Sequence, residues 1–255
     1  MSIYIRMIIL MIFGAISIGA AYGPQSSIKS LPEIESEIAI SLDLGNSNVE
    51  QTAVNLAKDF PGEYNINQVC EIFGTLRKEW FYFSDPSYAN KYKSANLTLQ
   101  DGMISNTIGM GNCDDFAILM SSLISSLGGS TRITFASNMS STEGHAYSEV
   151  FLGWENDSQV DELINWIKAE YNLAEIPGLN RKDGEVWLNL DWWADYPGGP
   201  YYEGNEQKEE IWQSEKLISP KIIPIIDTMN SISGWETLDD DKGSSISIGL
   251  YPARN

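Results

Sequence analysis

The residues of this chain best suited to chemistry are a cysteine, a histidine and an aspartate, which follow one another in that order. The chain contains a single histidine, His145, so any proton transfer through an imidazole must use this position. Cys113 precedes it and Asp191 follows it. A thiol becomes a strong nucleophile when a base takes its proton and a third group orients that base. These residue types therefore predict an activated thiol for acyl transfer.

The cysteine opens the most regular helical pattern in the chain. The run GMGNCDDF at 109–116 is followed by apolar residues at three- and four-residue spacing, namely Leu119, Met120, Leu123, Ile124 and Leu127. At the first turn of a helix, unpaired N–H groups and the positive end of the helix dipole favour a thiolate and can bind an oxyanion. Gly109 and Gly111 are expected to let the backbone turn sharply and keep the sulfur accessible. The charges of Asp114 and Asp115 oppose a thiolate, so we expect these side chains to point away from the sulfur.

The histidine and the aspartate are predicted to lie on neighbouring strands. His145 begins an alternating segment at 145–152, which follows a predicted strand at 131–136. Asp191 ends a third apolar strand at 185–191. In an antiparallel sheet its carboxylate could hold one ring nitrogen of the histidine and fix the tautomer.

The cysteine has three other interpretations. Cys70 is the second of the two cysteines, and in an exported chain Cys70 and Cys113 could form a structural disulfide. Cys113 could also be a small buried hydrophobe, although a core cysteine would more naturally lie within the apolar stripe of its helix. One histidine and two distant cysteines give no familiar zinc-ligand spacing, so we expect no metal and no cofactor.

The remaining pattern places helices first and antiparallel strands afterwards. The predicted elements are helices at 49–60, 66–83 and 161–171, a long loop at 87–111, and edge strands at 221–226 and 245–251. Asn48 and Asn65 are the expected caps of the first two helices. Loops as long as the predicted one tend to be functional. The layout predicts an α+β fold, with the cysteine helix packed on an antiparallel sheet.

The N-terminal segment predicts export. Arg6 is followed by an unbroken run of apolar and small residues up to Tyr22, which is typical of a signal peptide at 1–22. The segment is almost long enough to span a bilayer, so an uncleaved membrane anchor is the alternative. Both place the body outside the cytoplasmic membrane, secreted or anchored on its outer face. Residues 23–47 are then predicted to be a linker, and 48–255 a catalytic domain with a C-terminal extension from about 205.

The charge of the chain argues against two classes of partner. The formal net charge is −19, from 35 acidic and 16 basic residues. Such a surface repels the phosphates of nucleic acids and of anionic lipids, so neither is an expected ligand. The charge is weak evidence for a cationic substrate, and a solvated acidic coat explains it more simply.

Together these motifs resemble the transglutaminase-like superfamily, whose fold is papain-like. The run GMGNCDDF at 109–116, its apolar helix and the following arginine-containing TRI at 131–133 are similar to the cysteine motif of the family. GHAYSEV at 144–150 is similar to its histidine motif, and WLNLD at 187–191 to its aspartate motif. The aromatic run WFYFSDP at 80–86 resembles the helix end before the family's loop. The resemblance covers about 49–204.

The resemblance implies a role for each residue. Cys113 would be the nucleophile, His145 the general base and then the general acid, and Asp191 the group that orients the ring. The substrate would be a peptide or isopeptide amide, for example one of the cell envelope, attacked to give a thioester. Hydrolysis, as by a protease, amidase or isopeptidase, is the expected outcome. The alternatives are transamidation, or a non-catalytic peptide-binding or scaffold module of the same fold.

Aromatic residues beside these motifs are candidates for substrate binding. Trp192, Trp193 and Tyr196 follow the aspartate directly, and Trp80 and Tyr82 lie in the aromatic run ahead of the cysteine. Such side chains could wall a groove for a peptide or a sugar-peptide. Core packing is the ordinary explanation and stays open for each of them. Trp80 or Tyr82 could also donate a hydrogen bond to an oxyanion.

Overall fold

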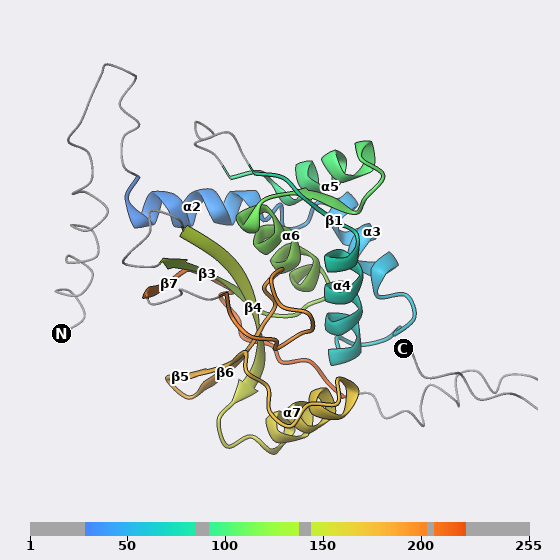
Figure 1. The fold of residues 1–255 in the computed structure, drawn as a ribbon, viewed down its shortest axis with the longest axis vertical. Helices are drawn as coiled ribbons and strands as arrows, with labels where there is room; N and C mark the ends of the chain where they lie inside the picture. The colour runs from blue at the N-terminus through green and yellow to red at the C-terminus, as the bar shows by residue number, and fades with distance from the viewer. Residues whose placement is uncertain (1–28, 85–91, 138–143, 203–206, 223–255) are drawn as a thin grey trace, which may run out of the picture. The chain divides into compact units, whose positions relative to one another are not determined.

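Six helices and a five-stranded antiparallel sheet make up the part of the chain that the structure describes (Figure 1). The computed structural model describes residues 29–84, 92–137, 144–202 and 207–222. The predicted signal or anchor at 1–22 and the predicted strand at 245–251 lie outside these ranges. The α+β class predicted from the sequence is confirmed. None of the helices in the described ranges has the length and hydrophobicity needed to span a bilayer.

The elements follow one another from helical to mainly β. The helices are α2 (Leu31–Ser41), α3 (Ser47–Leu56), α4 (Ile66–Lys78), α5 (Ala95–Ile104), α6 (Cys113–Ser126) and α7 (Ser158–Glu170). The strands are β1 (Trp80–Tyr82), β2 (Gly109–Gly111), β3 (Thr131–Ser137), β4 (Gly144–Trp154), β5 (Leu179–Lys182), β6 (Glu185–Asn189) and β7 (Gln207–Gln213). The large sheet has the strand order β5-β6-β4-β3-β7, and each pair of neighbouring strands in it is antiparallel. β1 and β2 form a separate parallel pair.

Helix α6 is the central element of the core. Its residues from Asp115 to Ile124 are all buried, because it contacts β3 and β4 on one side and α3, α4 and α5 on another. Figure 1 shows this helix between the sheet and helices α3, α4 and α5. Complete burial of its apolar stripe stabilises the fold and fixes where its first residue, Cys113, lies. The predicted cysteine helix on an antiparallel sheet is therefore confirmed.

Strand β4 brings the second and third motifs together. It pairs with β3 on one side and β6 on the other, and Glu149 lies opposite Asn189. The strands predicted at 131–136, 145–152 and 185–191 correspond to β3, β4 and β6. Because β4 and β6 are antiparallel, the start of β4 and the chain just beyond β6 lie at the same end of the sheet.

The linker predicted for 23–47 is wrong from Leu31 onward, where α2 begins. Ile38 and Leu42 are fully buried, so this segment is part of the core. The sequence was misleading because serine, proline and glutamate also begin helices. Here the carboxylate of Glu33 accepts hydrogen bonds from the backbone and hydroxyl of Ser30, and a proline occupies the first turn.

Two further predictions are wrong around β1 and β2. The helix predicted at 66–83 begins after its expected cap, Asn65, but it ends at Lys78. The last part of the predicted helix forms strand β1 instead. The loop predicted at 87–111 contains α5 and β2. The pairing of β1 with β2 joins segments far apart in the sequence, which periodicity within one window cannot reveal.

The sheet also has two edge strands that were not predicted, β5 and β7. β7 pairs with β3, so the segment predicted as an extension from about 205 completes the main sheet. Its sequence, QKEEIWQ, is too polar to signal a strand. Of the predicted strand at 221–226, Lys221 forms an isolated bridge to Asn65, and most of the remainder lies outside the described residues. Helix α3 is capped by Asn46 instead of Asn48.

Candidate functional site

The first turn of α6 is fixed by a reciprocal cap. The side chain of Asn112 accepts a hydrogen bond from the backbone N–H of Asp115 at 3.3 Å, and the Asp115 carboxylate accepts one from the backbone N–H of Asn112 at 3.1 Å. The N–H of Phe116 donates to the Asn112 carbonyl. The N–H of Cys113 occupies the first helical position, where the helix provides no acceptor. The cysteine is therefore held at the positive end of the helix dipole.

The carboxylate of Asp115 also takes part in an ion pair inside the protein. It is fully buried and lies 3.5 Å from Nζ of Lys93, which also contacts Asp101 at 3.1 Å and donates to the Met110 carbonyl at 3.1 Å. The opposing charge of Asp115 is thereby compensated next to the cysteine helix. Sequence reasoning missed Lys93 because this residue lies in the segment predicted to be a loop.

The glycines before Cys113 serve close packing. A Cβ atom at Gly111 would lie 2.1 Å from Oδ2 of Asp115, and one at Gly109 would lie 2.5 Å from Cζ3 of Trp80. Neither glycine has a positive φ. Neither position therefore needs the left-handed backbone that favours glycine, and the missing side chains instead admit the capping carboxylate and the indole ring.

His145 and Asp191 form a buried hydrogen-bonded pair. Nε2 of His145 lies 2.7 Å from Oδ2 of Asp191, and their side chains are 9% and 0% exposed. The other carboxylate oxygen accepts the backbone N–H of Trp193 at 3.1 Å. The backbone N–H of Asp191 donates to the side chain of Asn189 at 3.1 Å. Both ends of the aspartate are therefore fixed before any substrate binds.

The histidine ring also interacts with the cysteine. Burial alone would lower the pKa of His145, but hydrogen bonds to Asp191 and Cys113, together with their charges, raise it from 6.5 to about 9. Both cysteines are free, so the alternative of a disulfide between Cys70 and Cys113 is wrong. Burial raises the pKa of the Cys70 thiol to about 12, which makes it a poor nucleophile. The structure thus brings the predicted cysteine, histidine and aspartate together.

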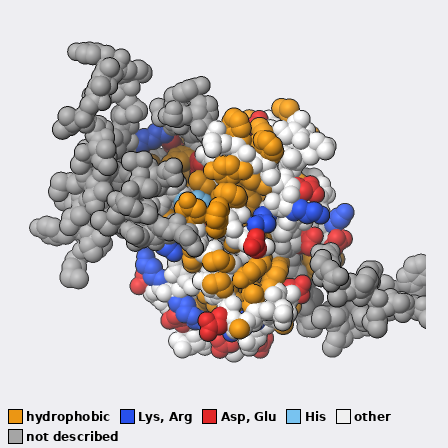
Figure 2. All heavy atoms as spheres, in the orientation of Figure 1, with side chains coloured by type: hydrophobic (Ala, Val, Ile, Leu, Met, Phe, Trp, Pro, Cys, Tyr) orange, Lys and Arg blue, Asp and Glu red, His pale blue; other side chains and the backbone are white. Residues whose placement is uncertain are grey.

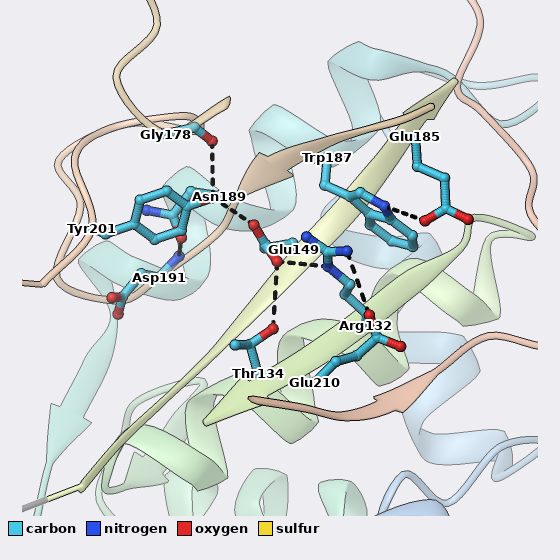
Figure 3. Close-up of polar contacts among 10 residues, drawn as sticks. All are labelled: Arg132, Thr134, Glu149, Gly178, Glu185, Trp187, Asn189, Asp191, Tyr201 and Glu210. Carbon is cyan, nitrogen blue, oxygen red and sulfur yellow. Dashed lines mark hydrogen bonds and ion pairs between the residues drawn. The ribbon is translucent and has the colours of Figure 1, made fainter. Parts of the chain in front are cut away.

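A buried polar network supports the strands that carry these residues (Figure 3). Nε of Arg132 donates to Oε2 of Glu149 at 2.7 Å, and the hydroxyl of Tyr201 donates to Oε1 of the same carboxylate at 2.5 Å. The Arg132 guanidinium lies 4.4 Å from the centre of the Trp187 ring. The neighbour of Tyr201, Tyr202, lies against His145 with 4.8 Å between ring centres. Both tyrosines belong to the aromatic-rich run that follows Asp191, but the sequence does not indicate that Tyr202 contacts His145, because only the folded chain brings these two rings together.

An aromatic groove lies beside the three residues. It has a volume of about 490 Å³ and is lined by Arg77, Trp80, Tyr82, Trp192, Trp193 and Asp195. Four of the five residues predicted for substrate binding therefore line one groove. The fifth, Tyr196, stacks on Tyr171 with 5.7 Å between ring centres and does not line it. Figure 2 shows hydrophobic side chains gathered across one face of the molecule.

Comparisons with known proteins identify the family. No curated protein matches the chain significantly. Among solved structures it is similar to a crystal structure of a protein from Parabacteroides distasonis, described as a "putative protease", with 12% identity and a TM-score of 0.37. The match covers 52% of this chain and 29% of that one, so this chain corresponds to less than a third of its solved relative. The model of the transglutaminase-like superfamily matches residues 54–192, more than half of the chain. The chain therefore belongs to the transglutaminase-like superfamily.

Proposed function

We propose that this protein is a cysteine hydrolase of the transglutaminase-like type that acts on peptide or isopeptide amides. Cys113 is the nucleophile, His145 carries the proton and Asp191 orients the ring. The observation that supports this most strongly is that the ring of His145 is hydrogen-bonded to Asp191 and lies close enough to Cys113 for the thiol to raise the pKa of the ring, while the cysteine occupies the first turn of α6. Each of these contacts matches one requirement for an activated thiol.

The resting state of the pair follows from the charge of the ring. With a pKa of about 9, His145 is protonated at neutral pH. A protonated ring cannot act as the base toward a thiol, so we propose that Cys113 reacts as the thiolate half of a thiolate–imidazolium pair. The proton transfer expected from the resemblance as the first step has then already taken place. The helix dipole and the N–H of Cys113 favour the same ionic state.

In the acylation step the thiolate attacks the carbonyl carbon of the amide. The C–S bond forms, and the electron pair of the C=O double bond moves to oxygen. When the tetrahedral intermediate collapses, the C–N bond breaks and His145 gives its proton to the leaving amine. The product is a thioester on Cys113 and a neutral imidazole.

In the second step the neutral ring of His145 takes a proton from water, and the resulting nucleophile attacks the thioester. The C–S bond breaks, the carboxylic acid leaves, and the thiolate–imidazolium pair is restored. Asp191 holds the ring in one orientation through both steps and stabilises its positive charge. A primary amine in place of water gives transamidation by the same route.

The oxyanion of each intermediate needs hydrogen-bond donors close to the sulfur. The backbone N–H of Cys113 is the first candidate, because it has no intrahelical acceptor. Of the two aromatic candidates, Trp80 is favoured over Tyr82. Its indole N–H is buried and finds no acceptor within the described residues, and its ring lines the groove.

Reactivity of the thiol tests this proposal directly. We expect Cys113 in a Cys70→Ser background to react with iodoacetamide as readily at pH 6 as at pH 8, and a peptide aldehyde to protect it. An ordinary thiol, with a pKa near 8.5, would lose roughly tenfold in rate for each pH unit below that value. Such a loss would show that no thiolate–imidazolium pair exists. Tight peptide binding that survives Cys113→Ala, without turnover by the wild type, would support the scaffold alternative instead.

Export is part of the same proposal and rests on the segment at 1–22. We expect this segment, fused to a reporter enzyme that is active only outside the cytoplasm, to direct the reporter there. Substituting its central apolar residues by lysine should abolish the signal. Reporter activity that is unchanged by the lysines would exclude an export role for the segment.

A further inference from the structure

The aromatic groove is connected to the reacting groups by a chain of ring contacts. Tyr82 lies 4.6 Å from Trp192, the residue next to Asp191 in the chain. Burial, and then the charge of the nearby Cys113, raise the pKa of Tyr82. At the other side Trp193 lies 5.1 Å from Tyr202, which contacts the ring of His145. A group bound in the groove would therefore lie beside the bond that Cys113 attacks.

The shape of the groove favours a bulky side chain with a planar or branched form. The rings of Trp192 and Trp193 are 5.7 Å apart and 89° to one another, so they form a corner. An aromatic ring placed in such a corner would face one indole and meet the other edge-on, which is a favourable pairing. A sugar ring would instead need the broad, unobstructed face of one aromatic side chain to stack on. Trp193 and Tyr82 are 48% and 44% exposed, so a ligand there would remove much apolar surface from water.

The polar atoms of the groove favour a ligand that brings acceptors. Nε of Arg77 and Nε1 of Trp192 are buried N–H donors that have no acceptor among the described residues. The one carboxylate of the groove, Asp195, is exposed and already paired with Arg77 at 2.6 Å. Buried donors without acceptors cost free energy that a ligand can recover. The carbonyl oxygens of an extended peptide are acceptors of this kind.

We propose that the aromatic groove is a specificity site, which binds an aromatic or large aliphatic side chain next to the residue whose carbonyl Cys113 attacks. Carbonyl oxygens of the same peptide then accept hydrogen bonds from Arg77 and Trp192. This proposal rests on the proposed function and adds the class of peptide that is recognised.

Matched peptides test the proposal in two independent ways. The peptides are identical except for phenylalanine or alanine at the position next to the attacked residue. Binding is measured to the Cys113→Ala variant, by calorimetry and by tryptophan fluorescence. Turnover by the wild type is measured as kcat/KM. The phenylalanine peptide is expected to bind more tightly and to be hydrolysed with a roughly 10- to 100-fold higher kcat/KM.

Two variants locate the preference in the groove. Trp193→Ala removes an exposed wall, leaves the backbone N–H that holds Asp191, and should abolish the preference for phenylalanine while the alanine peptide is still hydrolysed. Phe81→Ala is the matched control, because Phe81 is 50% exposed, lies in β1 and does not line the groove. It should leave both peptides unaffected.

The possible failures are distinguishable. If the wild type hydrolyses both peptides equally, or Trp193→Ala keeps the preference, the groove proposal is overturned and the proposed function stands. If the phenylalanine peptide binds preferentially through Trp193 but no peptide is turned over, the groove proposal stands and the hydrolase proposal fails. Tighter binding of an N-acetylglucosamine oligosaccharide than of either peptide would assign the groove to a glycan and overturn this proposal.

Discussion

The side chains of His145 and Asp191 meet at 2.7 Å although 46 positions separate them in the chain. Their approach follows from strand pairing. Glu149 of β4 lies opposite Asn189 of β6 in an antiparallel ladder, so the chain beyond β6 runs toward the start of β4. The sheet thus provides the orientation that a histidine needs to transfer protons between fixed partners.

Asp191→Asn should lower the pKa of His145 and the activity together. The carboxylate is the first of the partners that raise this pKa to about 9, and an amide carries no charge to replace it. Because His145 is the only histidine, its NMR titration can be read without assignment. We expect the midpoint to fall below 9 and kcat/KM to fall by roughly 100-fold or more. Asp183→Asn makes the same chemical change at an exposed turn and should alter neither quantity; an unchanged midpoint in Asp191→Asn would contradict the pairing.

The same pair makes folding stability depend on pH in a defined direction. The folded-state pKa of His145, about 9, lies above its ordinary 6.5, so the folded protein binds this proton more tightly. The stabilisation is fully present below pH 6.5 and is lost as pH rises through 9. It amounts to at most about 3 kcal/mol. Urea unfolding of the wild type should therefore show a larger loss between pH 6 and pH 10 than unfolding of His145→Gln, and parallel pH dependences would refute the assignment.

Gly111→Ala should disrupt the start of α6. A Cβ atom at this position would lie 2.1 Å from the carboxylate of Asp115, so the cap must shift. We expect a loss of about 1–3 kcal/mol in the free energy of unfolding, and a lower rate of Cys113 alkylation. Gly74→Ala is the control, because Gly74 lies in α4 and a Cβ atom there meets nothing within 4 Å. It should stabilise by about 0.5–1 kcal/mol. Equal effects of the two substitutions would contradict the role of Gly111.

The parts of the fold and site that could be predicted are those whose sequence pattern lies within one short segment. Helix α6 could be predicted because its apolar stripe, its cap and its terminal glycine all lie within one stretch of sequence. β3 and β4 could be predicted for the same reason, because the alternation of apolar and polar residues lies within each segment. The cysteine, histidine and aspartate were found because motifs of the family surround each of them.

What was missed depends on contacts between distant segments. Lys93 is important only because the fold places it beside Asp115, and nothing around it in the sequence indicates this. Tyr202 lies on His145, and its neighbour Tyr201 is hydrogen-bonded to Glu149 inside the sheet, so both contacts depend on the folded chain. Arg132 and Glu149 are charged residues inside strands, where alternation predicts solvent exposure. Instead both are buried, because each supplies the partner that the other needs.

That mutual dependence gives a last prediction. Glu149→Gln leaves the buried guanidinium of Arg132 without its close anion and should reduce the free energy of unfolding by roughly 3–5 kcal/mol. Tyr201→Phe removes one hydrogen bond to the same carboxylate and should cost roughly 1–3 kcal/mol. Because both changes act on one network, the double variant should lose less than the two losses added together. Urea unfolding measures all three, with Glu162→Gln on the exposed face of α7 as a control expected within about 0.5 kcal/mol of the wild type. Strict additivity would mean that Tyr201 and Arg132 bind Glu149 independently, and Tyr201 would then hold Tyr202 against His145 without help from the buried ion pair.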